Sequence, residues 1–104
     1  MKKTVFISKL MNGLEDKEIK RIRKKIQVHF SMQGDTIADT YFDFDDEKLK
    51  QFGVKNLGLY YLARSIEEMA YCDIAYFCKG WEKARGCKIE HEAAVAYGLE
   101  IIYE

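Results

Sequence analysis

Short apolar runs alternate along the chain with longer stretches in which apolar residues recur every three or four positions. Thr4–Ser8, residues 73–78 and residues 100–103 are rich in β-branched and aromatic residues, and these runs predict strands. The run at 73–78 hardly alternates between apolar and polar residues, which is typical of a strand buried on both faces of a sheet. Residues 36–44 have a similar composition and predict a further strand.

The amphipathic stretches predict helices at residues 15–31, 57–71 and 86–97, with a short helical piece around Leu49 and Phe52. The apolar stripes of the first two helices are Ile19, Ile22, Ile26 and Phe30, and Leu59, Leu62, Ile66 and Met69. The third helix carries alanines that are small enough to pack closely on a sheet, and a glycine follows it in the position of a C-terminal cap.

The order of these elements favours a parallel sheet with helices on both faces. We therefore expect an α/β protein with a small flavodoxin-like or Rossmann-like three-layer fold and a parallel sheet of about four to five strands. The length of 104 residues suits one small domain, 1–104, and the modest core of such a domain would gain stability from self-association.

The charge balance and the cysteines narrow the classes of partner and compartment. Lys plus Arg and Asp plus Glu number 17 each, and this neutral total argues against a nucleic-acid polymer as partner, although it is compatible with a local basic patch. No apolar run is long enough to cross a membrane, and the apolar run near the N-terminus is too short for a signal peptide. The three cysteines form neither a CxxC motif nor a zinc-binding spacing, so we expect a cytoplasmic protein with reduced thiols.

Glu90 is the sharpest candidate for chemistry. Residues 73–98 predict a buried strand, a polar loop with two glycines, and a helix that carries this carboxylate in its first turn. In an open α/β sheet such a helix start lies over the crevice at the carboxyl ends of the strands, where ligands bind. A carboxylate there can stabilise or attack the anomeric carbon while an N-glycosidic bond breaks. The alternative is an ordinary first-turn glutamate that complements the helix dipole.

The loop after the first predicted strand and two arginines are candidates for substrate binding. The loop contributes Ser8, Met11, Asn12 and Gly13. Its backbone amides and the serine hydroxyl can hold a phosphate or a ribose. It lacks the GxGxxG and P-loop patterns, so an ordinary strand-to-helix turn is the alternative. Arg64 and Arg85 are the cations best placed to meet a phosphate, and both are equally compatible with surface charges.

Cys87, His91 and an acidic cluster allow other chemistry. Cys87 and His91 lie four residues apart on one helix face, and a thiol near a helix N-terminus has a lowered pKa, which would suit a Cys-His nucleophile. The alternative is a packed small residue beside a surface histidine. The acidic residues at 43–47 suit either a hard cation or a solvated loop.

The remaining polar and aromatic candidates have mainly structural interpretations. We expect Asp73 to cap the junction before its strand, at the end of the sheet away from the crevice. Trp81, Tyr60 and Tyr61 suit stacking on a base or packing in the core or at an interface.

Two segments of the chain resemble motifs of the nucleoside 2-deoxyribosyltransferase superfamily, which includes 2'-deoxynucleoside 5'-phosphate N-hydrolases. Residues 6–13 are Phe-Ile-Ser-Lys-Leu-Met-Asn-Gly, and residues 80–91 are Gly-Trp-Glu-Lys-Ala-Arg-Gly-Cys-Lys-Ile-Glu-His. A Gly-x-x-x-Glu-x-x-x-Ala-x-x-x-Gly pattern follows a strand that opens with Asp. Small bacterial and phage domains of unknown function in that superfamily are the closer match. The resemblance covers nearly the whole chain.

The resemblance implies a flavodoxin-like α/β fold with a cleft for a small-molecule nucleoside or nucleotide. It implies that Glu90 is the nucleophile and that the segment from Ser8 to Gly13 meets the sugar or phosphate. Gly86, together with Arg85, belongs to the segment that would roof the same cleft. The resemblance further implies active sites shared between subunits of a homodimer or higher homo-oligomer.

This chain departs from the superfamily pattern at two positions. Ser65 stands where characterised members carry an aspartate that helps to protonate the leaving base or to orient the substrate, and a serine cannot act as that acid. Ala84 stands where the nucleotide hydrolases use a serine to hold phosphate, a role for which Arg85 is a possible substitute. The candidates to replace the acid are Tyr60, Tyr61 and the acidic residues at 43–46.

Two functional hypotheses and one structural hypothesis follow. The favoured one is an N-glycosidic bond hydrolase or deoxyribosyltransferase that uses Glu90 and needs neither a metal nor an organic cofactor. The second is a non-catalytic nucleotide-binding or sensing module of the same fold. The third is an assembly partner that acts through its aromatic surface.

Overall fold

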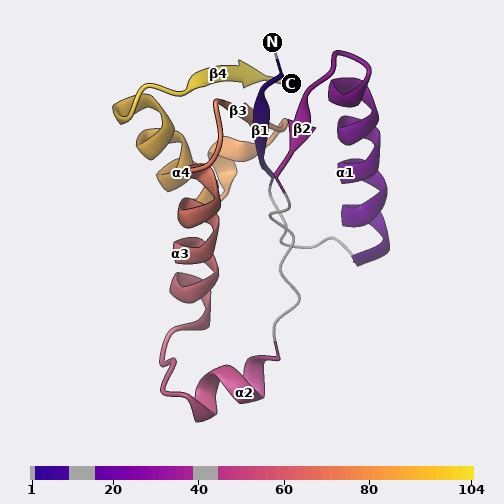
Figure 1. The fold of residues 1–104 in the computed structure, drawn as a ribbon. Helices are drawn as coiled ribbons and strands as arrows, with labels where there is room; N and C mark the ends of the chain where they lie inside the picture. The colour runs from indigo at the N-terminus through magenta and orange to yellow at the C-terminus, as the bar shows by residue number, and fades with distance from the viewer. Residues whose placement is uncertain (1, 10–15, 39–44) are drawn as a thin grey trace.

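The structure, a computed structural model, describes residues 2–9, 16–38 and 45–104 (Figure 1). Four strands within them form one sheet, namely β1 (Thr4–Ser8), β2 (Thr36–Ile37), β3 (Ile74–Phe77) and β4 (Glu100–Tyr103). The strands lie in the order β2-β1-β3-β4, and all neighbours pair in parallel. The predicted α/β class with a parallel sheet is therefore confirmed, and the arrangement is that of a small three-layer flavodoxin-like or Rossmann-like fold.

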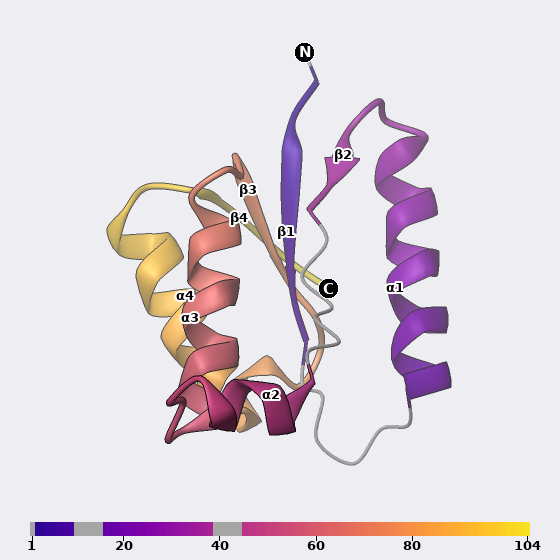
Figure 2. The same cartoon turned by 60° about the horizontal axis from the view of Figure 1, so that its bottom comes forward.

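Helices cover both faces of this sheet (Figure 2). The helix α1 (Asp16–Ser31) lies against one face, whereas α3 (Leu57–Met69) and α4 (Arg85–Ala96) lie side by side on the other. The short α2 (Asp46–Gln51) precedes α3, and the 3-10 helix η1 (Trp81–Lys83) connects β3 to α4. Parallel strands need such helical crossovers because the chain must return to the same end of the sheet before each new strand. Within the described residues no helix is long and apolar enough to span a membrane.

The alternation of side chains along β1 divides the core into two clusters. Val5 packs with Phe30 of α1 on one face of the sheet, whereas Phe6 packs with Met69 of α3 on the other. Successive side chains of a strand point to opposite faces. Ser8, two residues after Phe6, therefore lies on the face that α3 and α4 cover, at the carboxyl end of the strand.

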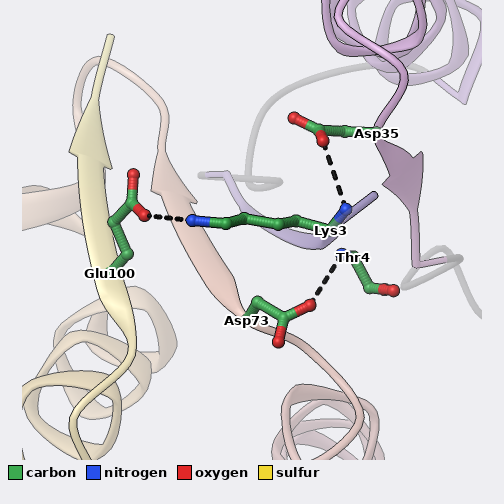
Figure 3. Close-up of polar contacts among 5 residues, drawn as sticks. All are labelled: Lys3, Thr4, Asp35, Asp73 and Glu100. Carbon is green, nitrogen blue, oxygen red and sulfur yellow. Dashed lines mark hydrogen bonds and ion pairs between the residues drawn. The ribbon is translucent and has the colours of Figure 1, made fainter. Parts of the chain in front are cut away.

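Charged side chains tie the strands together at the amino end of the sheet (Figure 3). The backbone amide of Lys3 donates to Asp35 Oδ1 at 3.2 Å, and its ammonium pairs with Glu100 Oε1 at 3.0 Å. The backbone amide of Thr4 donates to Asp73 Oδ2 at 3.0 Å. The prediction that Asp73 caps this junction, away from the carboxyl ends of the strands, is therefore confirmed.

One predicted detail is wrong, and another can be compared with the structure only in part. Leu59 is 61% exposed, so it does not continue the buried stripe of α3. It lies in the first turn of α3, which extends past the sheet towards α2 (Figure 1), and the stripe begins one turn later. Of the strand predicted at 36–44, the structure shows β2 at Thr36–Ile37, and residues 39–44 lie outside the described ranges.

Candidate functional site

Glu90 lies in the second turn of α4, not in its first turn as the sequence predicted. The helix begins at Arg85 with Ala84 as its N-cap, and no acidic residue occupies its first turn. A glutamate that merely complements the helix dipole belongs within the first turn, so this position needs another explanation. The side chain points inward, because Glu90 is only 8% exposed.

The carboxylate of Glu90 accepts a hydrogen bond from the carboxyl end of β1. The Oγ atom of Ser8 donates to Glu90 Oε1 at 2.7 Å, and both residues are buried. Hydrogen bonds to an ionised acceptor are shorter and stronger than those between neutral groups. Ser8 and Glu90 are 82 residues apart in sequence, and their hydrogen bond links β1 to α4 at the edge of the core.

Burial and hydrogen bonding act in opposite directions on the ionisation of this acid. Burial raises the pKa of Glu90, and hydrogen bonds with Ser8 and Ser65 partly offset that rise. Desolvation disfavours the charged form, whereas donors aimed at the carboxylate favour it. Ser65 comes from α3, so three elements contribute to the site: β1, α3 and α4.

Cys87 adjoins the same cluster, and of the two interpretations that the sequence allowed, the structure supports the packed small residue. Burial raises the pKa of Cys87, while a hydrogen bond with Ser8 lowers it to a lesser degree. The expected effect of the helix N-terminus was a lower pKa, and desolvation outweighs it here. The thiol is therefore a packed group beside Ser8 rather than an activated nucleophile.

His91 belongs to an aromatic cluster that is separate from Cys87. Its ring stacks on Trp81 with the centroids 4.2 Å apart, and its Nε2 atom lies 2.7 Å from the hydroxyl of Tyr103. Phe77 packs edge-on against the same ring at 4.9 Å. These contacts support the structural interpretation of His91 and Trp81 and give no support to a Cys-His pair.

The other predicted binding residues differ in their contacts and exposure. Gly86 lies where α4 approaches α3, because a Cβ atom there would be 4.0 Å from Leu62 Cδ1. Arg64 forms an ion pair with Glu67 on its own helix, and Arg85 is exposed at the first residue of α4. Three of the predicted residues lie outside the described ranges, namely Met11, Asn12 and Gly13.

The acidic cluster has structural contacts in the part that the structure describes. Asp45 caps α2 through its side chain, Asp46 Oδ1 accepts from the Tyr61 hydroxyl at 2.7 Å, and Glu47 pairs with Lys50 at 3.6 Å. In residues 2–9, 16–38 and 45–104, no group of three or more His, Cys, Asp or Glu side chains is arranged to hold a metal ion.

Sequence reasoning named the three main residues of the site but missed their direct contact. The sequence indicates a substrate-binding role for Ser8 and a lost acid at Ser65, whereas Ser8 donates a hydrogen bond to the carboxylate of Glu90 and Ser65 helps to lower the pKa of that carboxyl. The alternation of side chains along β1 could have predicted this contact, because it places Ser8 on the same face as Phe6 and hence below α4.

Comparison with known proteins identifies the family. A model of a domain of unknown function, DUF4406, matches residues 3–103. The chain belongs to the DUF4406 family. No curated protein and no solved structure matches it. Membership of DUF4406 assigns no activity, so the chemistry has to be argued from the Ser8–Glu90 pair and its surroundings.

Proposed function

We propose that this DUF4406 protein cleaves the N-glycosidic bond of a nucleoside or nucleotide, by hydrolysis or by deoxyribosyl transfer, with Glu90 as nucleophile. The observation that carries the proposal is the buried carboxylate that accepts a hydrogen bond from Ser8 at the carboxyl end of β1. In parallel α/β sheets this end of the strands is where ligands bind. The resemblance to nucleoside 2-deoxyribosyltransferases supplies the reaction class.

The reaction uses the carboxylate in its ionised form. One carboxylate oxygen attacks the anomeric carbon while the bond to the base nitrogen breaks, and the electron pair of that bond leaves with the base, which then takes up a proton. Water, or a second base in the transferase, then attacks the same carbon and releases the carboxylate. Hydroxyl donors suit this role because they hold the side chain and stabilise its charge without a competing cation.

Protonation of the leaving base needs a donor other than Ser65. Tyr61 lies one helical turn before Ser65, on the same side of α3, and its hydroxyl contacts Asp46 at 2.7 Å. The sequence had named both residues as candidates, and the structure brings them into contact. We assign the phenol of Tyr61 the role of hydrogen-bond donor to the base, with Asp46 fixing its position, since a hydroxyl hydrogen can rotate between acceptors.

Release of free base from a panel of deoxynucleosides and their 5'-monophosphates tests the proposal. We expect release from at least one substrate, loss of release in Glu90→Gln, and retention in the matched control Glu92→Gln, an exposed glutamate of the same helix. Tyr61→Phe should reduce kcat while leaving KM nearly unchanged if the phenol acts on the leaving group. The proposal fails if the unaltered protein releases no base from any substrate.

The second candidate is a non-catalytic nucleotide-binding or sensing module. Ser65 favours it, because a hydroxyl that bonds Glu90 replaces the acid of characterised relatives. This module would be stabilised thermally by nucleotides through mass action and would show no turnover. Arg85→Ala and Ser8→Ala should weaken the stabilisation, and unchanged affinity in both variants would contradict it.

The same proposal includes a small-molecule nucleoside or nucleotide as partner, no metal or organic cofactor, and a cytoplasmic location. It also includes a homodimer or higher homo-oligomer, in which a neighbouring subunit would complete the site. Light scattering across a dilution series, with activity measured at each concentration, tests whether assembly and turnover are lost together.

A further inference from the structure

The helix α1 has two faces of opposite character. Its apolar stripe packs on the sheet, and Ile19 and Phe30 are almost fully buried there, at 5% and 2% exposure. The opposite side carries four exposed basic residues at spacings of four, three and one, which places them together on a helix of 3.6 residues per turn. These residues are Lys17, Arg21, Lys24 and Lys25, and we call them the cationic face.

The cationic face is not neutralised by ion pairs within the described residues. In the part of the chain that the structure describes, none of its four side chains forms an ion pair or a hydrogen bond. The helix contains six basic and two acidic residues, a net charge of +4 with His neutral. Since the whole chain is neutral, with 17 residues of each sign, the remainder carries −4. The neutral total therefore conceals a strong separation of charge.

The chemistry of this surface favours a partner recognised by negative charge alone. Protein interfaces usually centre on aromatic or large apolar anchors, whereas the exposed apolar side chains nearest to the cationic face are Val28 and Met32, at 52% and 84% exposure, and neither is aromatic. Insertion of α1 into a membrane surface would require its apolar stripe, which the sheet already buries. Phosphodiester backbones, by contrast, are bound through rows of Lys and Arg without apolar contacts.

We propose that the cationic face of α1 binds the phosphate backbone of double-stranded DNA without reading its bases. The four cations span about 12 Å of a rigid helix, and the major groove of B-DNA admits an α-helix between its two backbones. This inference is independent of the proposed chemistry at Glu90. It revises the expectation, based on the neutral total charge, that no nucleic-acid polymer is a partner.

The expected affinity follows from the number of cations. Release of counterions from about four phosphates gives a slope of roughly −3.6 for the logarithm of the binding constant against the logarithm of salt concentration. Binding should therefore weaken roughly a hundredfold between about 50 mM and 200 mM salt. A dissociation constant of about 10⁻⁴ M at physiological salt is the weak end of non-specific DNA binding.

Fluorescence anisotropy with a labelled duplex of mixed sequence, about two helical turns long, tests this surface. The variant exchanges all four residues of the cationic face for Gln, a good helix former, and should lose binding at least tenfold at low salt. The matched control makes the same change of net charge away from α1, at the exposed residues Lys2, Lys48, Lys55 and Lys83. Circular dichroism of both variants checks that the fold is retained.

Three results would overturn the proposal. The first is no binding of the duplex by the unaltered protein at low salt. The second is an equal loss in the control variant, which would show that total charge rather than the cationic face matters. The third is tighter binding of an equal-length single strand, an acidic peptide or anionic vesicles than of the duplex. Base release at Glu90 is measured separately, so neither proposal depends on the other's outcome.

Discussion

The two ends of the sheet handle charge in different ways. At the amino end, Lys3 and Glu100 form an ion pair between side chains that are 43% and 52% exposed. At the carboxyl end, Glu90 is buried and accepts hydrogen bonds from serine hydroxyls instead of a cation. The first arrangement leaves both charges in contact with water, where a pair contributes little to stability. The second removes a charge from water, and its partners within the described residues are neutral hydroxyl groups.

This difference separates a structural edge from a candidate functional one. A buried acid without a paired cation is destabilised in its charged form, and such groups are frequent at sites of chemistry. At the amino end no buried carboxylate has to be charged, because Asp35 and Asp73 accept hydrogen bonds from backbone amides near the surface. Variants at each end should therefore respond differently to substitution and to pH.

The largest effect is expected at Ser8. Ser8→Ala removes the donor to a buried carboxylate, and loss of a hydrogen bond to a charged group costs about 2 kcal/mol in the free energy of unfolding near neutral pH. The pKa of Glu90 should rise further, because the Ser8 hydrogen bond lowers it. Urea unfolding and a carbon-13 NMR titration of the glutamate carboxyls measure the two quantities. Ser31→Ala, at an exposed serine of α1, is the control, and an unchanged Glu90 titration in Ser8→Ala would contradict the contact.

Glu90→Gln should give an intermediate, pH-dependent effect. Because burial raises the pKa of Glu90 in the folded protein, the folded state binds the proton more tightly than the unfolded state does. The unaltered protein should therefore lose stability as pH rises from about 4.3, the ordinary value of glutamate, through the raised pKa. The variant lacks this loss. Its free energy of unfolding should therefore rise relative to that of the unaltered protein over that pH range and then stay constant. A difference between the two proteins that stays constant with pH would contradict the raised pKa.

Asp73→Ala tests the amino end and should cost about 1 kcal/mol or less. The carboxylate accepts from the Thr4 amide at an exposed position, where water can replace it. Thermal unfolding at neutral pH measures the loss. A loss larger than that of Ser8→Ala would reverse the proposed ranking of the two ends of the sheet.

Lys3→Met should have the smallest effect, confined to one pH range. The hydrogen bond and charge of Glu100 raise the pKa of Lys3 above its ordinary value of 10.5. A raised lysine pKa stabilises the folded state below 10.5 and ceases to do so as pH rises through the folded value. The small stability difference from the unaltered protein should therefore vanish at strongly alkaline pH and shrink with added salt. Persistence of the difference in both conditions would point to a packing role for the lysine stem.

The sequence predicted the elements of the fold well, because their signals are local. The stripe of α1, the unbroken apolar run of β3 and the glycine after α4 each depend on neighbouring residues. Leu59 was misplaced for the opposite reason, since helical spacing fixes the side of α3 but not how far the sheet extends beneath it.

The sequence identifies the main residues of the site but only part of their arrangement. The sequence indicates Glu90 and Ser8, but it predicts the start of α4 one residue late and places Glu90 in the first turn. The direction of the Cys87 pKa was wrong, because burial is a property of the tertiary structure and outweighs the local effect of a helix end. The roles given to Met11, Asn12 and Gly13 remain predictions.

The alternation of β1 restricts how this strand can change in length. Deletion of one residue before Ile7 in this strand would turn the hydroxyl of Ser8 towards α1 and move Ile7 to the face that α3 and α4 cover. Insertions or deletions of two residues would instead preserve which side chains face each layer. Homologues and engineered versions of this protein should therefore vary β1 in steps of two, or move their serine to an adjacent position when they do not.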